Sequence, residues 1–389
     1  MRSSTMEYDI CVFTSAHCAS DTRIFRKEVM TLLNAGYKVL YYTNQCSQDI
    51  SSGNEQESIF SHNNLTVIYN KGFNIEKRIG RFLRSFGMFF WINKRCKVYH
   101  FHDPDLIVCG AFLKILGKKV IYDVHENYID NISEKPYLSG FVRKVLSSLY
   151  KFFENLFCRR YNMIIAATPS IKASYDIRRY RNVNVIYNFP KRQELLSSLD
   201  SERSPKEDTF IYVGGLTEIR GITNLVNALE IANSIKSINL VLAGPISPPS
   251  YKKELESLAG WKNVKYLGTI SRSQMAREFS QAMCGICIFK PLKNHVEAMP
   301  NKIFEYMSAG LPILCSHFDL WKELVVLTNT GYVCDPEDVN SIANALVSIS
   351  NLSKKELQEK GKSGIDLIET KYSWENEEKE LLNIYQNMI

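Results

Sequence analysis

Short apolar runs alternate with amphipathic stretches along most of the chain. The runs at 8–14 (YDICVFT) and 38–43 (KVLYYT) are rich in aromatic and β-branched residues, and the amphipathic stretch 22–35 lies between them. Asp21 is a good N-cap for a helix over 22–35, and Gly36 is a natural helix stop. A strand–helix–strand order in which the strands are apolar throughout predicts a parallel sheet covered by helices.

The same alternation returns in the second half of the chain. Apolar runs at 209–213, 238–243, 263–268 and 284–289 are separated by stretches with helical periodicity. Residues 191–207 (KRQELLSSLDSERSPKE) are polar and lack such periodicity, which is typical of a linker. We therefore expect an α/β fold with two Rossmann-like parallel-sheet domains. Their boundaries are predicted at 1–190 and 208–370, with the linker 191–207 between them and a final helix over 371–389.

Composition narrows the class of protein. The net charge of +7 over 389 residues is moderate, whereas a large nucleic-acid footprint is usually more basic. The first ten residues lack the apolar core of a signal peptide, and no apolar run reaches the length of a membrane-spanning helix. The ten cysteines mostly lie in apolar runs, so we interpret them as reduced core residues of a cytoplasmic protein. The C-x-x-C spacing of Cys284 and Cys287 opens one such run and favours strand packing over a redox or zinc site.

Two amphipathic stretches, 74–95 and 140–160, combine aromatic residues with Lys and Arg. A basic amphipathic helix with aromatic residues is typical of an element that lies in a membrane interface. A helix that packs on the core through one face and solvates its basic face has the same pattern. Both interpretations stay open for each stretch.

Polar residues follow two predicted strands of the first half. His100, His102 and Asp103 end one strand, and Asp123, His125 and Glu126 end the next. Functional residues gather at the carboxyl ends of strands in parallel α/β sheets, so His102, Asp103 and His125 are candidate site residues. Asp103 and Asp105 also form a D-x-D pattern, which we discount as a metal site because that metal-binding motif belongs to enzymes of a different architecture with one catalytic domain.

The most informative stretch is 291–313 (PLKNHVEAMPNKIFEYMSAGLPI). Pro300 suits a first helical position, residues 301–309 favour a helix, and Gly310 is a natural C′ residue. Glu297 precedes the predicted helix and Glu305 lies within it. The N-terminus of a helix binds phosphate through free N–H groups and the macrodipole, so two carboxylates that flank it could bind hydroxyls on both sides of a diphosphate.

The string EAMPNKIFEYMSAGLPI resembles the E-x7-E segment of the retaining glycosyltransferases of family 4, which have the GT-B architecture. FTSAHCASDTRIFRKEVMTLLNAGYKVL, HFHDPDL, YDVHENY, YVGGLTEIRGI, LAGP and YSWENEEKELLNIY agree with the family in order and spacing. This resemblance implies two Rossmann-like domains that face each other across a cleft, with a C-terminal helix that crosses back to the first.

The resemblance also implies roles for individual residues. His125 and Glu297 would be catalytic, and the acceptor side would include His17, Arg23, His102 and Asp103. The donor would be held by a larger set: Gly214, Gly215, Arg220, Gly244, Met299, Pro300, Asn301, Lys302 and Glu305. This chain departs from the family at Gly215, where an Arg is usual, and in the loop that contains His17. Arg220 can still clamp a phosphate, and Lys302 is a candidate for the missing cation.

The expected activity is retaining transfer of a sugar from a nucleotide-diphosphate sugar, with a UDP-sugar favoured, and without a cofactor or a metal. The expected acceptor is a glycan or a lipid-linked glycan in cell-surface polysaccharide assembly. The chain would be cytoplasmic, with peripheral contact to the anionic inner face of the cell membrane and no nucleic-acid partner. The alternatives are a nucleotide-sugar epimerase of the same architecture and a non-catalytic subunit that binds a nucleotide-sugar.

Overall fold

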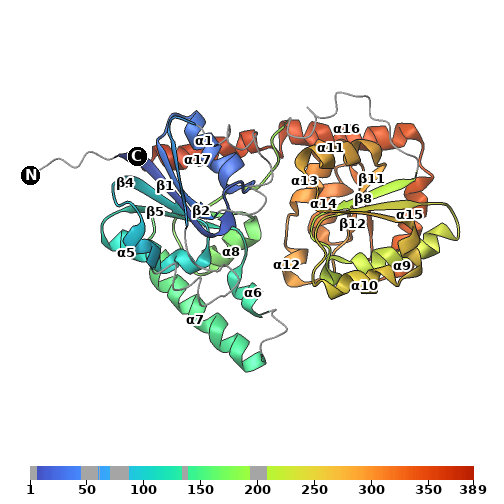
Figure 1. The fold of residues 1–389 in the computed structure, drawn as a ribbon, viewed down its shortest axis with the longest axis horizontal. Coiled ribbons are helices and arrows are strands. Elements are labelled where there is room, and N and C mark those ends of the chain that lie inside the picture. Colours follow the sequence, from blue (N-terminus) through green and yellow to red (C-terminus); the bar gives the residue numbers. More distant parts are fainter. Residues whose placement is uncertain (1–6, 45–59, 61, 71–86, 134–138, 193–207) are drawn as a thin grey trace, which may run out of the picture. The chain divides into compact units, whose positions relative to one another are not determined.

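The computed structural model describes residues 7–44, 60, 62–70, 87–133, 139–192 and 208–389. It divides into two compact units, one formed by Met1–Asn188 together with Asn376–Ile389 and the other by Phe189–Glu375 (Figure 1). Most of the predicted linker, residues 193–207, lies outside the described residues. The same holds for residues 74–86 of the first amphipathic stretch, whereas residues 87–91 are helical.

The first unit is built on a seven-stranded sheet in the order β3-β2-β1-β4-β5-β6-β7, and every neighbouring pair is parallel. The predicted parallel sheet is therefore confirmed. The strands are β1 (Tyr8–Cys18), β2 (Val39–Asn44), β3 (Leu65–Tyr69), β4 (Cys96–Phe101), β5 (Lys119–Val124), β6 (Met163–Ala166) and β7 (Val183–Val185). β1 is longer than the predicted strand over 8–14, because residues 15–18 continue it to Cys18, which pairs with Asn44 after a shift in register.

Helices connect these strands and cover the sheet. They are η1 (Ile24–Val29), α1 (Met30–Asn34), η2 (Pro104–Leu106), α5 (Ile107–Ile115), α6 (Tyr128–Ser133), α7 (Gly140–Cys158), α8 (Pro169–Ile177) and the returning helix α17 (Trp374–Gln386). A core of aromatic and aliphatic side chains fills the space between helices and sheet. In it the ring of Phe101 stacks on that of Tyr122 with their centroids 4.7 Å apart, and it lies 5.6 Å from the ring of Phe13. The core therefore fixes the strand ends that carry the candidate residues.

The predicted single α-helix over 22–35 is wrong in one respect. The segment η1 has the wider turn of a π-helix, in which the amide of Glu28 donates to the carbonyl of Arg23, five residues earlier, at 3.0 Å. Five residues of an ordinary α-helix span well over one turn, so Arg23 and Glu28 would point in different directions. The wider turn lets both side chains enter one buried site, where Arg23 Nε lies 3.0 Å from Glu28 Oε1.

The second unit has a six-stranded parallel sheet in the order β10-β9-β8-β11-β12-β13. Its strands are β8 (Thr209–Val213), β9 (Asn239–Ala243), β10 (Val264–Gly268), β11 (Cys284–Cys287), β12 (Ile313–Ser316) and β13 (Gly331–Cys334). Its helices are η3 (Glu218–Arg220), α9 (Ile222–Asn233), α10 (Ser250–Glu256), η4 (Ala259–Asn263), α11 (Arg272–Gln281), α12 (Lys293–Val296), α13 (Asn301–Ser308), α14 (Asp319–Val325), α15 (Val339–Ser350) and α16 (Lys354–Thr370). Cys284 and Cys287 are buried free thiols in β11, so the prediction of strand packing is confirmed.

The helix α17 begins in the second unit and continues into the first, as predicted for the end of the chain. Within the first unit, the Tyr385 hydroxyl lies 2.6 Å from His100 Nδ1, and Glu377 accepts a hydrogen bond from the amide of Tyr187 at 2.8 Å. The returning helix thus contributes side chains to the buried part of a unit that is otherwise built from the first half of the chain.

A search of the described helices for a membrane-spanning segment found none with the required length and apolar character.

Candidate active site

Each sheet has a switch point at which the order of its strands reverses, and the candidate residues of each unit lie next to its own switch point. In the first unit the chain proceeds outward from β1 to β3 on one side and from β4 to β7 on the other, and in the second unit β8 and β11 are the corresponding neighbours. Ligands of open α/β sheets bind outside the carboxyl ends of the strands at such switch points. His17 lies near the end of β1 and His102 follows β4, while Gly214 follows β8.

A buried ion pair organises the cluster in the first unit. Arg23 donates two hydrogen bonds to Asp123, from Nε at 3.0 Å and from Nη2 at 2.9 Å, and Nη1 donates to the carbonyl of Ile186. Both side chains are buried. Burial alone raises the pKa of a carboxyl group, but the guanidinium outweighs it and holds the pKa of Asp123 well below its usual range.

Asp123 in turn contacts the candidate catalytic histidine. His125 Nε2 lies 3.5 Å from Asp123 Oδ2 and 3.3 Å from His102 Nδ1. The side chain of His125 is 22% exposed, whereas those of His102 and Asp123 are fully buried. Buried groups therefore hold the Nε2 edge of the His125 ring in place, and the exposed part of the ring can contact a ligand.

His17 and Asp103 form a second pair in the same cluster. His17 Nδ1 lies 3.2 Å from Asp103 Oδ1, and Asp103 also accepts hydrogen bonds from the Thr14 hydroxyl and the Ser15 amide. Burial lowers the pKa of His17, but the hydrogen bond and charge of Asp103 outweigh burial and raise it to about 9. The His17 and His125 rings are 5.4 Å apart, so a cationic imidazole lies beside the candidate catalytic one.

Burial shifts the pKa values of the remaining members toward their uncharged forms. Burial and the neighbouring Asp123 raise the pKa of Glu28 well above its usual value. Burial lowers the pKa of His102 to about 4 and also lowers that of His100, so both imidazoles are neutral at pH 7. The charge of Arg23 is balanced by that of Asp123.

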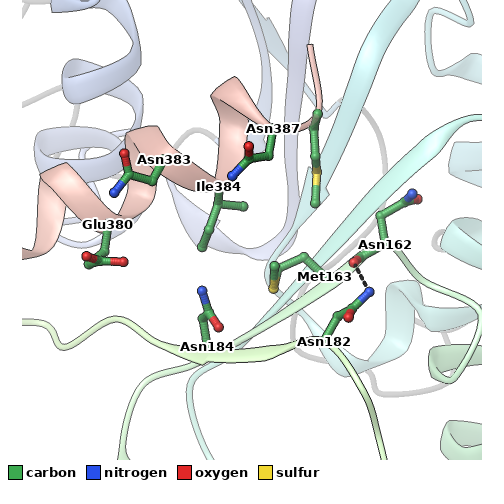
Figure 2. Close-up of a pocket in the computed structure, with 9 residues that line it drawn as sticks. Asn162, Met163, Asn182, Asn184, Glu380, Asn383, Ile384 and Asn387 are labelled. Carbon is green, nitrogen blue, oxygen red and sulfur yellow. Dashed lines mark hydrogen bonds between the residues drawn. The ribbon is translucent and has the colours of Figure 1, made fainter.

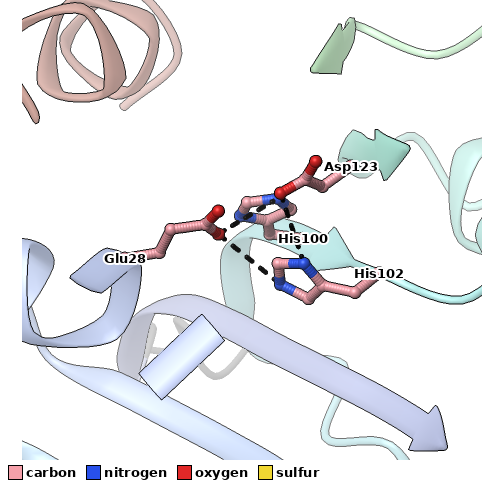
Figure 3. Close-up of side chains that lie close together, drawn as sticks. All are labelled: Glu28, His100, His102 and Asp123. Carbon is pink, nitrogen blue, oxygen red and sulfur yellow. Dashed lines mark ion pairs between the residues drawn. The ribbon is translucent and has the colours of Figure 1, made fainter. Parts of the chain in front are cut away.

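Four of these residues, Glu28, His100, His102 and Asp123, bring their ligand atoms within 4.8 Å of one another and could hold a metal ion (Figure 3). The distances from Glu28 Oε2 to the Nε2 atoms of His102 and His100 are 3.7 and 3.9 Å. Arg23 Nε and Nη2 lie 3.0 and 2.9 Å from carboxyl oxygens of Glu28 and Asp123, so the site already contains one buried positive charge, to which a divalent ion would add a second. Both carboxyl oxygens of Glu28 and the Nε2 atoms of His100 and His102 have no hydrogen-bond partner among the described residues.

Both carboxylates of the D-x-D pattern accept hydrogen bonds from residues of the first unit. Asp103 accepts hydrogen bonds from β1, and the Ser15 hydroxyl donates to the Asp105 carboxylate, 2.9 Å from each of its oxygens. These contacts anchor the loop after β4 to the end of β1, where the rings of His17 and His102 each lie 5.4 Å from that of His125.

In the second unit, a glycine turn creates the candidate donor site. Gly214 has φ +132° and Gly244 has φ +139°, a conformation that side chains disfavour. A Cβ on Gly244 would lie 2.0 Å from the Gly214 carbonyl oxygen, so the two strand ends can approach this closely only with glycine. The turn leaves backbone exposed beside two cationic side chains.

Those cations are Arg220 and Lys302. Lys302 Nζ would lie 3.1 Å from a Cβ on Gly214, and Arg220 Nη1 would lie 3.4 Å from a Cβ on Gly215. The Lys302 side chain is buried over the rings of Tyr212 and Phe289, at 3.9 and 4.8 Å from their centroids. Among the described residues its ammonium has no hydrogen-bond partner. A buried ammonium that relies on aromatic faces alone is incompletely satisfied, and an anion at this turn would complete it.

The E-x7-E stretch adopts the predicted order of elements, with two corrections. Glu297 caps the C-terminus of the short helix α12 rather than lying in an open loop, and Pro300 is the N-cap of α13 rather than its first residue. Gly310 has the expected positive φ of +63°. Met299, Pro300 and Asn301 lead into α13, whose first turn has no side-chain cap.

Two aromatic residues that the sequence did not single out hold this stretch in place. The Trp321 indole donates to the carbonyl of Ala298 at 2.8 Å, directly between Glu297 and Met299. The Tyr306 hydroxyl lies 3.1 Å from the Ile286 carbonyl and 3.3 Å from the Val213 amide, which joins α13 to β8 and β11. Both side chains are fully buried, so Glu297 and Lys302 are positioned by the core.

Glu305 has a protein partner that the sequence did not predict. Its Oε1 accepts a hydrogen bond from Arg272 Nη1 at 2.6 Å. The pair is partly exposed, with 20% of the Glu305 side chain and 32% of the Arg272 side chain accessible. Arg272 therefore orients one carboxylate oxygen of Glu305.

One cavity of the first unit, of about 400 Å³, lies away from these residues. Asparagines and residues of α17 line it, including Asn162, Asn184, Asn383 and Glu380 (Figure 2). Asn162 and Asn182 immediately precede β6 and β7, so this cavity opens at the amino ends of the strands. Because ligands of parallel sheets bind at the carboxyl ends, we assign the candidate site to the histidine cluster and the glycine turn rather than to this cavity.

Comparisons with known proteins identify the family to which the chain belongs. Residues 28–189 match the family model described as Glycosyltransferase Family 4, and residues 198–364 match the model described as Glycosyl transferases group 1. The two models cover consecutive parts of the chain and together include every candidate residue except His17 and Arg23. The protein is a glycosyltransferase of the group 1/family 4 type.

Known relatives of this glycosyltransferase agree with the assignment. An uncharacterized glycosyltransferase from Methanocaldococcus jannaschii is 25% identical over 322 residues, which cover 74% of this chain and 75% of that one. A sucrose-phosphate synthase from Thermosynechococcus elongatus has a TM-score of 0.72 at 17% identity, and covers 97% of this chain and 98% of its own. Anabaena HepE in complex with UDP has a TM-score of 0.69 at 14% identity, covering 97% of this chain and all of its own. These likenesses confirm the predicted GT-B fold class.

In this glycosyltransferase the structure brings together two groups of the predicted residues. His17, Arg23, His102, Asp103 and His125 share the cluster of the first unit, and Gly214, Gly215, Arg220, Gly244 and Lys302 share the glycine turn. Sequence reasoning missed Glu28, whose carboxyl reaches the cluster through the π-turn. It also missed the role of Asp123, although its place at the end of an apolar strand was a usable signal.

Proposed function

We propose that this glycosyltransferase transfers a sugar from a nucleotide-diphosphate sugar, with retention of configuration, to a glycan or lipid-linked glycan in cell-surface polysaccharide assembly. The observation that carries the donor half of this proposal is the ammonium of Lys302. It is buried without a hydrogen-bond partner among the described residues, beside Gly214 and close to Arg220. A diphosphate supplies the charge and the acceptor oxygens that this group lacks.

The layout of the second unit supports a nucleotide-sugar rather than a simple phosphate. The first turn of α13 offers backbone N–H groups to the diphosphate at Asn301 and Lys302. Glu297 precedes this turn and is proposed to accept hydrogen bonds from sugar hydroxyls, and Glu305 follows it and is proposed to bind the ribose. We favour a UDP-sugar as donor, in keeping with HepE, whose structure was determined with UDP.

The proposed chemistry is electrostatic. The bond between the anomeric carbon and the diphosphate breaks, and its electron pair stays on the departing phosphate oxygen beside Arg220, Lys302 and the α13 N-terminus. The acceptor oxygen forms the new bond on the same face, and its proton passes to the departing diphosphate. His125 is proposed to contact the reacting sugar, and His17, Arg23, His102 and Asp103 to form the acceptor side. No metal ion or cofactor takes part in this proposal.

The proposed acceptor places the protein at the cytoplasmic face of the cell membrane, because a lipid-linked glycan is anchored there. Net charge supports contact with anionic lipid, since Lys and Arg outnumber Asp and Glu by 48 to 41. Peripheral association is therefore part of the proposal.

The test is nucleotide release from a panel of UDP-, GDP- and ADP-sugars, with and without EDTA and with a membrane lipid extract as acceptor source. The variant Glu297→Ala is compared with Glu323→Ala, an exposed carboxylate on α14 of the same unit. We expect turnover of one donor that EDTA leaves unchanged, and a loss of about a hundredfold in Glu297→Ala alone.

Three results would contradict the proposal. Loss of turnover with EDTA would point to a metal at Asp103 and Asp105 or at the Glu28 cluster. Equal activity of Glu297→Ala and Glu323→Ala would remove Glu297 from the site. Inversion at the anomeric carbon, detected by NMR of the product, would overturn retention.

A further inference from the structure

The helix α7 has two apolar faces, and the core uses only one of them. On the inner face, Cys158 belongs to the hydrophobic core, and Tyr150 and Phe157 pack against it. Glu154 is buried on the same side, where it accepts hydrogen bonds from the hydroxyls of Tyr150 and Tyr175. These contacts fix the rotation of α7 about its axis.

The opposite face carries a second apolar stripe that faces solvent. Its main members are Phe141, Val145, Leu149, Phe152, Phe153 and Leu156, all exposed and spaced three or four residues apart or adjacent. Phe141 is 77% exposed and Phe152 60%. Isolated exposed apolar residues are common on protein surfaces, but a continuous stripe along a helix marks a surface that binds a partner or a membrane.

The charges around this stripe have one sign. Lys144 and Lys151 are exposed along the helix, and Arg159 and Arg160 are exposed at its C-terminal end. Glu154 is the only acidic residue between 140 and 160, and it is buried and paired with Arg178. The solvent face of α7 is therefore apolar and cationic without an exposed carboxylate. That combination complements anionic headgroups above an acyl layer.

We infer that the outer face of α7 binds the surface of an anionic phospholipid membrane. The inference deepens the proposed membrane location and rests on it only for the choice of lipid as the partner. Phe141, Leu149 and Phe152 enter the boundary between headgroups and acyl chains, while Lys144, Lys151, Arg159 and Arg160 contact lipid phosphates. The inner contacts of Tyr150 and Cys158 keep α7 on its sheet, so the helix binds without detaching.

The experiment is co-sedimentation of the full chain with phosphatidylcholine vesicles, with and without phosphatidylglycerol, over a series of salt concentrations. An apolar variant, Phe141→Gln/Leu149→Gln/Phe152→Gln, is compared with Ile235→Gln/Leu327→Gln, whose residues are 64% and 78% exposed in the second unit. A charge variant, Lys144→Gln/Lys151→Gln, is compared with Lys354→Gln/Lys355→Gln on α16. Glutamine is a good helix former, so the substitutions on α7 and α16 preserve helix propensity.

We expect wild type to bind vesicles that contain phosphatidylglycerol and to dissociate as salt rises. The apolar variant should lose about tenfold or more in partition coefficient and the charge variant about thirtyfold, since each of its two Lys residues contributes about 1 kcal/mol near an anionic surface. Both controls should bind like wild type. Circular dichroism and donor turnover, measured without vesicles, verify that each variant is folded.

Absence of wild-type binding to the anionic vesicles would overturn the inference, as would equal binding by the apolar variant and its control. If light scattering shows a wild-type dimer that the apolar variant converts to a monomer while vesicle binding is unaffected, the stripe is a contact between copies of the chain instead. The inference and the proposed function fail separately. Binding to vesicles without turnover of any donor would contradict only the proposed function. Turnover of a donor without binding to vesicles would contradict only the inference.

Discussion

The two units treat buried charge in opposite ways. In the first, the charge of Arg23 is matched by that of Asp123, the pKa of His102 is lowered to about 4 so that this group is neutral, and the pKa of Glu28 is raised. In the second, Lys302 is buried against aromatic faces and its ammonium lacks a hydrogen-bond partner among the described residues. A cluster whose charges balance can hold His125 in a fixed position, although the carboxyl oxygens of Glu28 and the Nε2 atoms of His100 and His102 also lack hydrogen-bond partners among the described residues. A cation without a counter-charge is completed by an anion, so we propose that the first arrangement positions side chains and the second binds the donor.

The largest expected effect comes from breaking the balance of the first unit. Asp123→Asn leaves the guanidinium of Arg23 buried without its counter-ion, and we expect a loss of about 3–5 kcal/mol in unfolding free energy. Urea denaturation measures it, with Asp319→Asn as control because that carboxylate is fully exposed. At a temperature where the variant is folded, UDP affinity should be unchanged, since the glycine turn belongs to the other unit. A stability equal to wild type would show that the cluster is not charge-balanced through Asp123.

The second prediction concerns the cation that has no counter-charge, and it expects a loss of affinity instead of a loss of stability. Lys302→Met removes a charge that is not balanced, so we expect unfolding free energy to change by no more than about 1 kcal/mol. UDP affinity should fall about tenfold to a hundredfold, because a charge-assisted hydrogen bond contributes about 1.5–3 kcal/mol. Calorimetric titration with UDP measures the affinity, and Lys322→Met, on α14 of the same unit, is the control. A strong loss of stability with unchanged affinity would make Lys302 a structural residue.

A pH series sharpens the comparison further. The pKa of His17 is raised from 6.5 to about 9 in the folded protein. The stabilisation from its pair with Asp103 is therefore complete below pH 6.5 and is lost as pH rises through 9. We expect His17→Gln to be less stable than wild type by about 1–2 kcal/mol at pH 6, since partial exposure of the ring screens the pair. The difference should shrink between pH 6.5 and 9. A difference that stays constant across this range would exclude the ion pair as its cause.

The smallest expected effect concerns Arg272 and Glu305. Their ion pair is partly exposed, so Arg272→Gln should cost less than about 1 kcal/mol in stability. If Arg272 orients Glu305 toward the ribose, this variant should raise the donor KM about threefold and leave kcat unchanged, while Glu305→Gln raises KM about tenfold. Steady-state kinetics separates the two constants. A larger effect from Arg272→Gln than from Glu305→Gln would assign the ribose contact to Arg272.

The sequence predicted the sheets because their strands are apolar runs bounded by clear turn signals. It also predicted the strand ends that carry His102, Asp103 and His125, since polar residues follow those runs directly. The π-turn at Ile24–Val29 was not predictable from helical periodicity, because it depends on Arg23 and Glu28 sharing a buried site with His102 from a distant strand. The same limit applies to the Arg272–Glu305 pair, which joins residues of two different helices.

The returning helix α17 has a consequence for the order in which the two units fold. Residues Phe189–Glu375 form one unit in an uninterrupted run, whereas the other unit needs Asn376–Ile389 as well as Met1–Asn188. During synthesis, the second unit can therefore finish folding while the first unit still lacks the contact between Tyr385 and His100. Nascent chains halted before residue 376 would present a completed second half beside an unfinished first one.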